Sequence, residues 1–352
     1  MQFRTIVDIP RPAFSIAPCE EMLFVGSCFA DNIGRRFKDE MFRATVNPFG
    51  VMYNPASILH TVERTDVAPR VAVFTLGTNH VYILRETGEI VDNCQKRPHR
   101  LFEERELTVE ECKDYLLRAV NILRERRPDV KVIITVSPIR YAKYGFHGSQ
   151  LSKATLLLAA DLLIKETTLN RESSIDKESS FRKESNISIE SNINKESSFR
   201  KESNISIESN INKESSFRKE SNISIESNIN KESGISKESS ISKDVSLNDE
   251  QGGAVVTYFP AYEIVNDELR DYRFYADDML HPSSVAVEYI WQRMVETFFS
   301  DEAKTFLREW APLKKGFSHR PLNPDGDEYK AFLAKLHAEA ELLKQRYKDM
   351  PL

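Results

Sequence analysis

Short apolar runs alternate with amphipathic segments over most of this 352-residue chain, and that alternation constrains its fold more than any other feature. Four runs have the length and content of buried strands, at residues 22–25, 71–76, 130–136 and 254–259. Segments with the spacing of amphipathic helices lie between or after them, at residues 31–40, 109–126, 285–299 and 329–347. This order is typical of a mostly parallel sheet with helices on both faces, and it predicts an α/β fold.

Weaker signals complete the expected order of elements. Further strands are expected at residues 42–46 and 80–84, and a short helix at 56–62. Thr108 and Glu111 have the spacing of a capping box, which satisfies free amides at the start of a helix. Another helix is expected to begin at Ser149 or Ser152 and to run to about Lys165.

Residues 171–242 consist of twelve consecutive hexapeptides, and the 18-residue unit 177–194 recurs unchanged at 195–212 and 213–230. The repeats carry too little apolar surface to offset the entropy that a chain loses on folding, so we expect disorder there. The alternative is a left-handed parallel β-helix, a solenoid built from hexapeptide repeats.

The repeats set the expected domain organisation. Residues 1–170 and 248–300 are expected to form one domain, with residues 171–247 as an insertion into it. Helices within residues 301–352 are expected to pack on that domain.

The composition excludes several classes of protein. A formal net charge of −5 gives no electrostatic argument for binding nucleic acid or an acidic membrane. Neither a signal peptide nor a membrane-spanning run is present, so we expect a cytoplasmic protein without membrane insertion. The four cysteines form no CxxC pair, and neither a metal site nor a disulfide framework is expected; they are Cys19, Cys28, Cys94 and Cys112.

The first candidate site follows the strand expected at residues 22–25. Gly26 permits a tight turn there, and Ser27 and Cys28 then lie at the carboxyl edge of the sheet beside a helix N-terminus. Because a helix N-terminus stabilises a thiolate, Cys28 is a candidate nucleophile whose pKa we expect below that of a free thiol. The alternative is a buried cysteine that acts as a small hydrophobic residue.

Three further motifs could complete a catalytic site. Asp278 precedes His281 by three residues, so its carboxylate can orient the imidazole as a general base. Gly77 and Asn79 follow another core strand, and the Asn79 amide is a candidate oxyanion donor. Gly50 ends the turn that begins at Asn47, and its amide is a second candidate donor. Each motif alone also fits a plain turn or surface loop.

The joint order of these motifs resembles a known family. The segment GSCFA at residues 26–30 resembles the defining motif of the GSCFA domain family, and NPFGVMYNP, TLGT, VSPIRY and RDYRFYADDMLHPS resemble its other blocks. The resemblance covers residues 20–300 apart from the repeats. It implies membership of the SGNH/GDSL hydrolase group, a flavodoxin-like three-layer α/β/α fold, and ester hydrolysis or acyl transfer without a cofactor.

The resemblance also implies roles for individual residues. Cys28 occupies the position of the SGNH nucleophile, with Ser27 as the alternative, and Asp278 and His281 match the D-x-x-H block unchanged. The glycine of the second SGNH block corresponds to Gly50. The G-x-N-D block corresponds to Gly77 and Asn79, but His80 replaces its aspartate, so the chain departs from the pattern there.

The expected function is therefore attack by Cys28 on an ester or acyl bond of a small molecule or an acylated glycan. The rival interpretation is an inactive SGNH-like module that binds such a ligand without turnover. A third assigns the function to the repeats, as a spacer or adhesive segment. Substrate identity, the choice between hydrolysis and transfer, and oligomeric state do not follow from the sequence.

Overall fold

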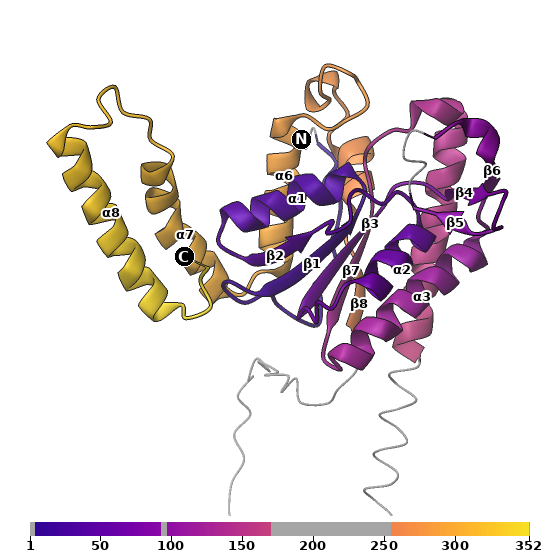
Figure 1. Ribbon diagram of the computed structural model, residues 1–352, viewed down its shortest axis with the longest axis horizontal. Helices are drawn as coiled ribbons and strands as arrows, with labels where there is room; N and C mark the ends of the chain where they lie inside the picture. Colours follow the sequence, from indigo (N-terminus) through magenta and orange to yellow (C-terminus); the bar gives the residue numbers. More distant parts are fainter. Residues whose placement is uncertain (1–3, 93–96, 170–254, 352) are drawn as a thin grey trace, which may run out of the picture. The chain divides into compact units, whose positions relative to one another are not determined.

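Five parallel strands form the central sheet in the order β2-β1-β3-β7-β8 (Figure 1). They are β1 (Glu21–Gly26), β2 (Arg43–Val46), β3 (Val71–Leu76), β7 (Lys131–Val136) and β8 (Val255–Tyr258). Counted within this sheet, the order is 2-1-3-4-5, the strand order of flavodoxin-like doubly wound sheets. The mostly parallel α/β sheet predicted from the apolar runs is confirmed.

The computed structural model describes residues 4–92, 97–169 and 255–351, all of which belong to one unit of the chain. The expected insertion at residues 171–247 lies outside the described residues. The predictions of disorder or a solenoid there stay predictions.

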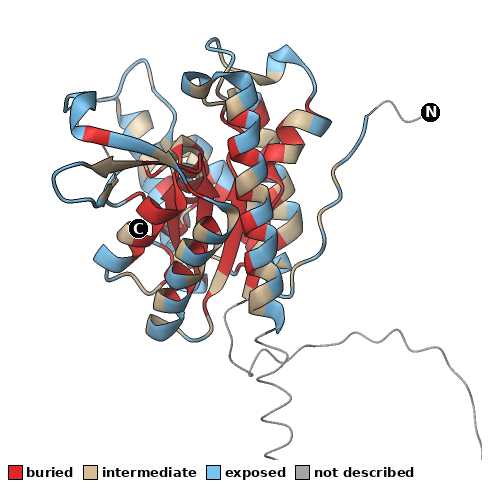
Figure 2. Ribbon diagram, turned by 90° about the vertical axis from the view of Figure 1, so that its right-hand side faces the viewer, coloured by how far each residue is buried: buried red, intermediate tan, exposed pale blue. Residues whose placement is uncertain are grey.

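Helices cover both faces of the sheet because successive side chains of each strand point to opposite sides. Leu23, Val25 and Phe74 pack with α2 (Pro55–Arg64), α3 (Val109–Arg126) and a helix over residues 145–169. Their neighbours along the strands, such as Phe24 and Val73, pack with α1 (Cys28–Asp39) and α6 (Ser284–Phe298). Figure 2 shows the buried strands between helices whose outer faces are exposed.

A second, three-stranded antiparallel sheet follows β3, in the order β5-β4-β6. Its strands are β4 (His80–Leu84), β5 (Ile90–Val91) and β6 (Phe102–Glu106). The strand predicted at residues 80–84 is confirmed, but β6 was missed because four of its five residues are charged and it gives no apolar alternation.

Helix starts were predicted with mixed success. Thr108 and Glu111 form the predicted capping box, with Thr108 Oγ1 accepting from Glu111 N at 3.2 Å and Glu111 Oε2 accepting from Thr108 N at 2.9 Å. The prediction that Ser149 or Ser152 begins the next helix is wrong, because that helix already begins at residue 145. Both serines are buried and bond other segments instead: Ser149 Oγ accepts from Tyr141 N and Ser152 Oγ from Asn79 N.

Two long helices follow α6, namely α7 (Asp301–Phe317) and α8 (Asp327–Arg346). The indole N–H of Trp310 in α7 donates to the Asp39 carbonyl at 3.0 Å, and Lys314 pairs with Glu40 at 2.8 Å. These contacts join α7 to the end of α1. The remaining short elements are η1 (His99–Leu101), η2 (Ala142–Tyr144), α5 (Ala261–Glu263), the π-helical turn η3 (Ile264–Glu268) and η4 (Tyr272–Phe274).

Candidate functional site

The turn between β1 and α1 is built by Gly26 and by the segments that hold it. Gly26 has a φ of 145°, and an added Cβ there would overlap the Thr75 carbonyl of β3. Its amide donates to Asn47 Oδ1 at 2.9 Å. Only glycine fits this close approach between β1 and β3, which sets the position of the next two residues.

Ser27 is the N-cap of α1 and is fully buried. Its hydroxyl accepts from Phe29 N at 3.2 Å and forms a second hydrogen bond with the Thr75 hydroxyl at 3.2 Å. Its own amide donates to Thr75 Oγ1 at 3.0 Å. With both groups engaged, Ser27 ties the helix start to β3.

Cys28 is the first residue of α1, and its thiol is partly exposed. Burial and the Asp31 carboxylate raise the pKa of the Cys28 thiol, whereas its backbone amide and the Tyr53 hydroxyl lower it. The prediction of a lowered pKa is therefore wrong in direction. A helix N-terminus lowers the pKa of a thiol, but here the desolvation of the thiol and the Asp31 carboxylate one turn along the same helix outweigh it.

Asn47 connects two of the sequence motifs, a role that the sequence did not suggest. Its side-chain oxygen accepts from Gly26 N, and its Nδ2 donates to Asp31 Oδ1 at 2.6 Å. Asn47 adopts a φ of 40°, a left-handed conformation that asparagine tolerates better than most residues. In the NPFG turn, the side chain that contacts the β1–α1 turn is Asn47. The sequence had predicted a role for the Gly50 amide, as an oxyanion donor.

Asp278 and His281 are in direct contact, as their spacing predicted. Asp278 Oδ2 lies 2.6 Å from His281 Nδ1, and Asp278 Oδ1 accepts from the amides of Leu280 and His281 at 2.9 and 3.0 Å. These amides and the imidazole lower the pKa of Asp278 to about 2. The carboxylate thereby fixes one imidazole nitrogen, and His281 Nε2 makes no hydrogen bond with any other described residue.

The loop that carries this pair lies at the carboxyl edge of the central sheet. Met279, between the two residues, has a φ of 58°, and the Leu280 carbonyl accepts from Arg140 N, four residues beyond the end of β7, at 3.1 Å. Cys28 follows the carboxyl end of β1 at the same edge. Cys28 and His281, both described, share no hydrogen bond, and their predicted approach within several Å stays a prediction.

The predicted oxyanion donors are engaged within the protein. The Gly50 amide donates to the Asn47 carbonyl at 2.9 Å, and the Gly77 amide donates to the Tyr53 carbonyl at 3.0 Å. Asn79 is buried, and its Nδ2 donates to the Leu107 carbonyl at 2.9 Å. In this conformation the Cys28 amide is the better candidate donor, because the first amides of a helix lack intrahelical acceptors.

Comparison with known protein families shows to which family the chain belongs. Residues 21–70, 67–172 and 231–294 match the GSCFA family, and residues 310–352 match the C-terminal domain of GSCFA domain proteins. The chain belongs to the GSCFA family. None of the curated proteins or solved structures compared with it matches.

His80 of the GSCFA protein is the first residue of β4. Its ring is buried and stacks on Tyr144, with centroids 3.6 Å apart. Burial lowers the pKa of His80, although Glu104 and Glu106 each approach one of its ring nitrogens at 3.8 Å. His80 thus links β4 to the η2 turn.

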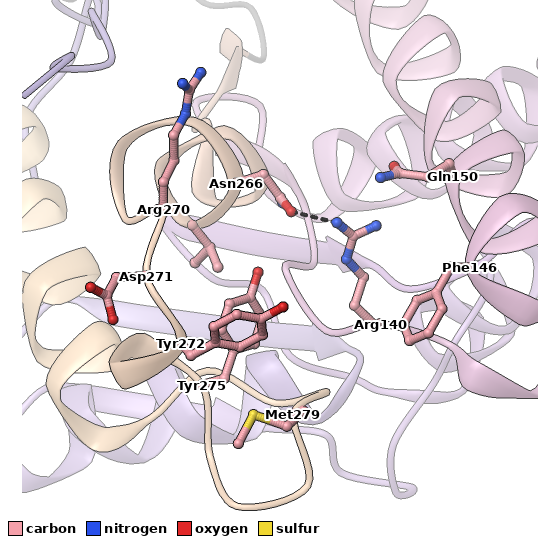
Figure 3. Close-up of a pocket in the computed structure, with 10 residues that line it drawn as sticks. Arg140, Phe146, Gln150, Asn266, Arg270, Asp271, Tyr272, Tyr275 and Met279 are labelled. Atoms are coloured by element: carbon pink, nitrogen blue, oxygen red, sulfur yellow. Dashed lines mark hydrogen bonds between the residues drawn. The ribbon is translucent and has the colours of Figure 1, made fainter.

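A pocket of about 520 Å³ lies beside the Asp278–His281 loop (Figure 3). Met279 and Tyr275 line it from that loop and the segment before it, and Arg140 lines it from the segment after β7. Six of its ten lining residues lie within the VSPIRY and RDYRFYADDMLHPS segments, namely Arg140, Arg270, Asp271, Tyr272, Tyr275 and Met279. No local spacing marks them as the lining of a pocket, because they come together only in the folded chain.

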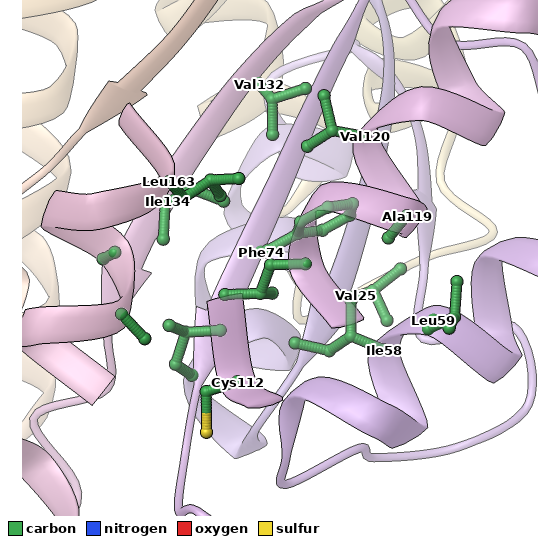
Figure 4. Close-up of a cluster of buried hydrophobic side chains, with 14 of the residues drawn as sticks. Val25, Ile58, Leu59, Phe74, Cys112, Ala119, Val120, Val132, Ile134 and Leu163 are labelled. Atoms are coloured by element: carbon green, nitrogen blue, oxygen red, sulfur yellow. The ribbon is translucent and has the colours of Figure 1, made fainter. Parts of the chain in front are cut away.

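The other described cysteines differ from Cys28 in their surroundings. Cys112 lies in the apolar cluster between the sheet and α3, beside residues such as Phe74 and Ile134 (Figure 4). Burial raises the pKa of both Cys19 and Cys112 to about 12. Cys94 lies outside the described residues. Cys28 is therefore the most accessible of the three described thiols.

In the ranges that the structure describes, no cluster of three or more His, Cys, Asp or Glu side chains is arranged to hold a metal ion. The helices described also include none with the length and apolar content needed to span a membrane.

Proposed function

We propose that this GSCFA protein is an SGNH-like hydrolase or acyltransferase that acts on an ester or acyl bond of a small molecule or an acylated glycan. The observation that supports this most is the short hydrogen bond between Asp278 and His281, 2.6 Å between Oδ2 and Nδ1, on a loop at the carboxyl edge of the sheet. Ligands of open α/β sheets bind along that edge. The strand order 2-1-3-4-5 agrees with the proposed relationship to the SGNH group.

In the proposed reaction, His281 Nε2 removes the thiol proton as Cys28 Sγ attacks the carbonyl carbon. The C–S bond forms, and the Cys28 amide stabilises the oxyanion. The C–O bond then breaks, and His281 returns the proton to the departing alcohol. Water or an acceptor hydroxyl then attacks the thioester carbonyl, and His281 accepts its proton. The C–S bond breaks, the acid or new ester leaves, and His281 passes the proton to Cys28 Sγ.

Cys28 is the better candidate nucleophile because the Ser27 hydroxyl is buried in two hydrogen bonds, one of which caps α1. The raised pKa of Cys28 means that the resting group is a thiol. The attack therefore depends on His281 as a general base during the reaction.

The second candidate function is an inactive SGNH-like module that binds an acylated ligand. The engaged amides of Gly50, Gly77 and Asn79 favour it, because the usual oxyanion donors of such a site point elsewhere. The Cys28 amide, which faces its own thiol, and the ordered Asp278–His281 pair favour catalysis.

The test is hydrolysis of p-nitrophenyl esters and thioesters by the full chain and by Cys28→Ala, Ser27→Ala and His281→Ala. We expect Cys28→Ala and His281→Ala to lose roughly a hundredfold or more in kcat/KM, as removal of catalytic groups does. Ser27→Ala should retain most activity at reduced stability. Turnover that survives in both Cys28→Ala and Ser27→Ala would contradict the proposed mechanism, and no turnover of any ester would favour the binding module.

A further inference from the structure

The pocket beside the Asp278–His281 loop is lined by both polar and aromatic side chains. Arg140, Gln150 and Asn266 supply polar groups, and Phe146, Tyr272 and Tyr275 supply aromatic rings (Figure 3). Phe146 is 66% exposed and Tyr272 is 80% exposed, so both rings are accessible to a molecule in the pocket.

Two amide side chains hold the Arg140 guanidinium. Asn266 Oδ1 accepts from Arg140 Nη2 at 2.7 Å, and Asn266 Nδ2 donates to the Tyr262 carbonyl at 2.7 Å, which fixes the orientation of the amide. Turning the Gln150 amide by 180° satisfies both of its ends: its oxygen then accepts from Arg140 Nη1 at 2.6 Å, and its nitrogen donates to the Tyr262 hydroxyl. The guanidinium is thus oriented by neutral oxygens.

The pocket has an excess of positive charge. Among described residues, no carboxylate forms an ion pair with Arg140 or with Arg270, which also lines the pocket. Asp271 is the acidic residue of the lining, and its carboxylate binds the Arg273 guanidinium at 2.9 Å. The positive charge of Arg140 is also felt by the buried Lys153 amine, because burial and Arg140 together lower the pKa of Lys153 to about 7.

A partly buried guanidinium held only by neutral groups favours an anion, because the fork geometry of arginine matches carboxylate and phosphate oxygens. We propose that this pocket binds the anionic end of the substrate, a carboxylate or phosphate carried on an apolar or aromatic group, with Arg140 as its main ligand. The aromatic walls then contact the apolar part.

The assignment of this anion to the substrate rests on the proposed function. Arg140 N bonds Leu280 O, and Met279 lines the pocket, so the pocket and the Asp278–His281 pair share one loop. Cys28 follows β1, which is two strands from β7, a separation on the order of 10 Å. The anion is therefore expected several bonds away from the carbonyl that reacts.

Turnover tests the inference with two p-nitrophenyl esters of equal chain length, the octanoate and the monoester of octanedioic acid. We expect kcat/KM to favour the carboxylate ester by roughly tenfold or more, the range of a charge-assisted hydrogen bond. Arg140→Gln should remove this preference, mainly through KM, and Arg140→Lys should retain part of it. Arg308→Gln, an exposed change of equal charge on α7, should leave the preference intact.

Direct binding separates this inference from the proposed function. Calorimetric titration of the full chain carrying Cys28→Ala with octanoate, and separately with phenyl phosphate, should give saturable binding of one or both, weakened at least tenfold by Arg140→Gln. Such binding without turnover of any ester would support the pocket and overturn the proposed catalysis. Ester turnover with no preference for the carboxylate ester, and no binding of either anion at millimolar concentration, would overturn the pocket and leave the catalysis standing.

Discussion

The Asp278 carboxylate orders His281 directly: it makes a 2.6 Å hydrogen bond to the imidazole and accepts from the His281 amide. It also accepts from the amide of Leu280, the residue before His281. Both side chains are partly exposed, so the pair is ordered by its own loop and not by burial. The positive φ of Met279 lets that loop turn tightly enough for one carboxylate to reach both amides.

Asp278→Asn should lower kcat/KM of any ester turnover by roughly a hundred- to ten-thousandfold, because an amide cannot hold the same imidazole tautomer. The pKa of Asp278 is lowered to about 2 from its ordinary 3.8. Its charge is therefore complete above pH 4 and is lost only as the pH falls toward 2. A pH profile of the wild type between 4 and 9 should show no ionisation from Asp278, and an Asn variant of normal activity would contradict this role.

Neighbouring groups set the reactivity of Cys28 with iodoacetamide. Asp31→Asn should speed its labelling at pH 8 by roughly two- to tenfold, because the carboxylate that raises the Cys28 pKa is gone while the Asn47 contact can remain. Tyr53→Phe should slow labelling, because the hydroxyl lowers that pKa. Asp39→Asn, at the other end of α1, is the matched control. Equal rates in all three variants would show that these contacts do not govern the thiol.

Much of the fold follows from local pattern. Buried strands such as β3 and the capping box of Thr108 were predictable because their signals lie within a few consecutive residues. The misplaced helix start at Ser149 or Ser152 has a tertiary cause, since Ser152 binds the backbone of Asn79 across the structure.

The site was less predictable than the fold. Asp278 and His281 are three residues apart, so their contact could be inferred from spacing. The surroundings of Cys28 come from Tyr53, and the orientation of Arg140 comes from Asn266, which is distant in sequence. No short-range pattern carries such contacts, and the direction of the Cys28 pKa shift depends on burial that only the folded chain shows.

Gly26→Ala should destabilise the protein by about 2–4 kcal/mol, because the new Cβ meets Thr75 and the backbone has a positive φ. Gly88→Ala also changes a glycine with positive φ, at 72°, but has no atom within 4 Å of the new Cβ. Its cost should be about 1 kcal/mol. Thermal unfolding of both variants checks this, and equal losses would show that close packing at Gly26 is unimportant.

Removal of residues 171–247, by joining Asn170 to Asn248, should change the melting temperature by less than about 4 °C, equivalent to roughly 1 kcal/mol. The described residues already fill both faces of the sheet, and loop-closure entropy varies slowly with loop length. Differential scanning calorimetry of the shortened chain is the measurement. A drop of more than 10 °C would show that the removed segment stabilises the domain.

The most direct test of the account is to trap the acyl group on the protein. The full chain and its Cys28→Ala, Ser27→Ala and His281→Ala variants would be mixed with a p-nitrophenyl ester that the full chain hydrolyses. The reactions would be quenched in acid, and the peptide that contains Ser27 and Cys28 would be examined by mass spectrometry. We predict acylation of Cys28, released by neutral hydroxylamine as a thioester is, retained in Ser27→Ala and lost in Cys28→Ala and His281→Ala. Acylation of Ser27, or of Cys28 at an unchanged rate in His281→Ala, would contradict the account.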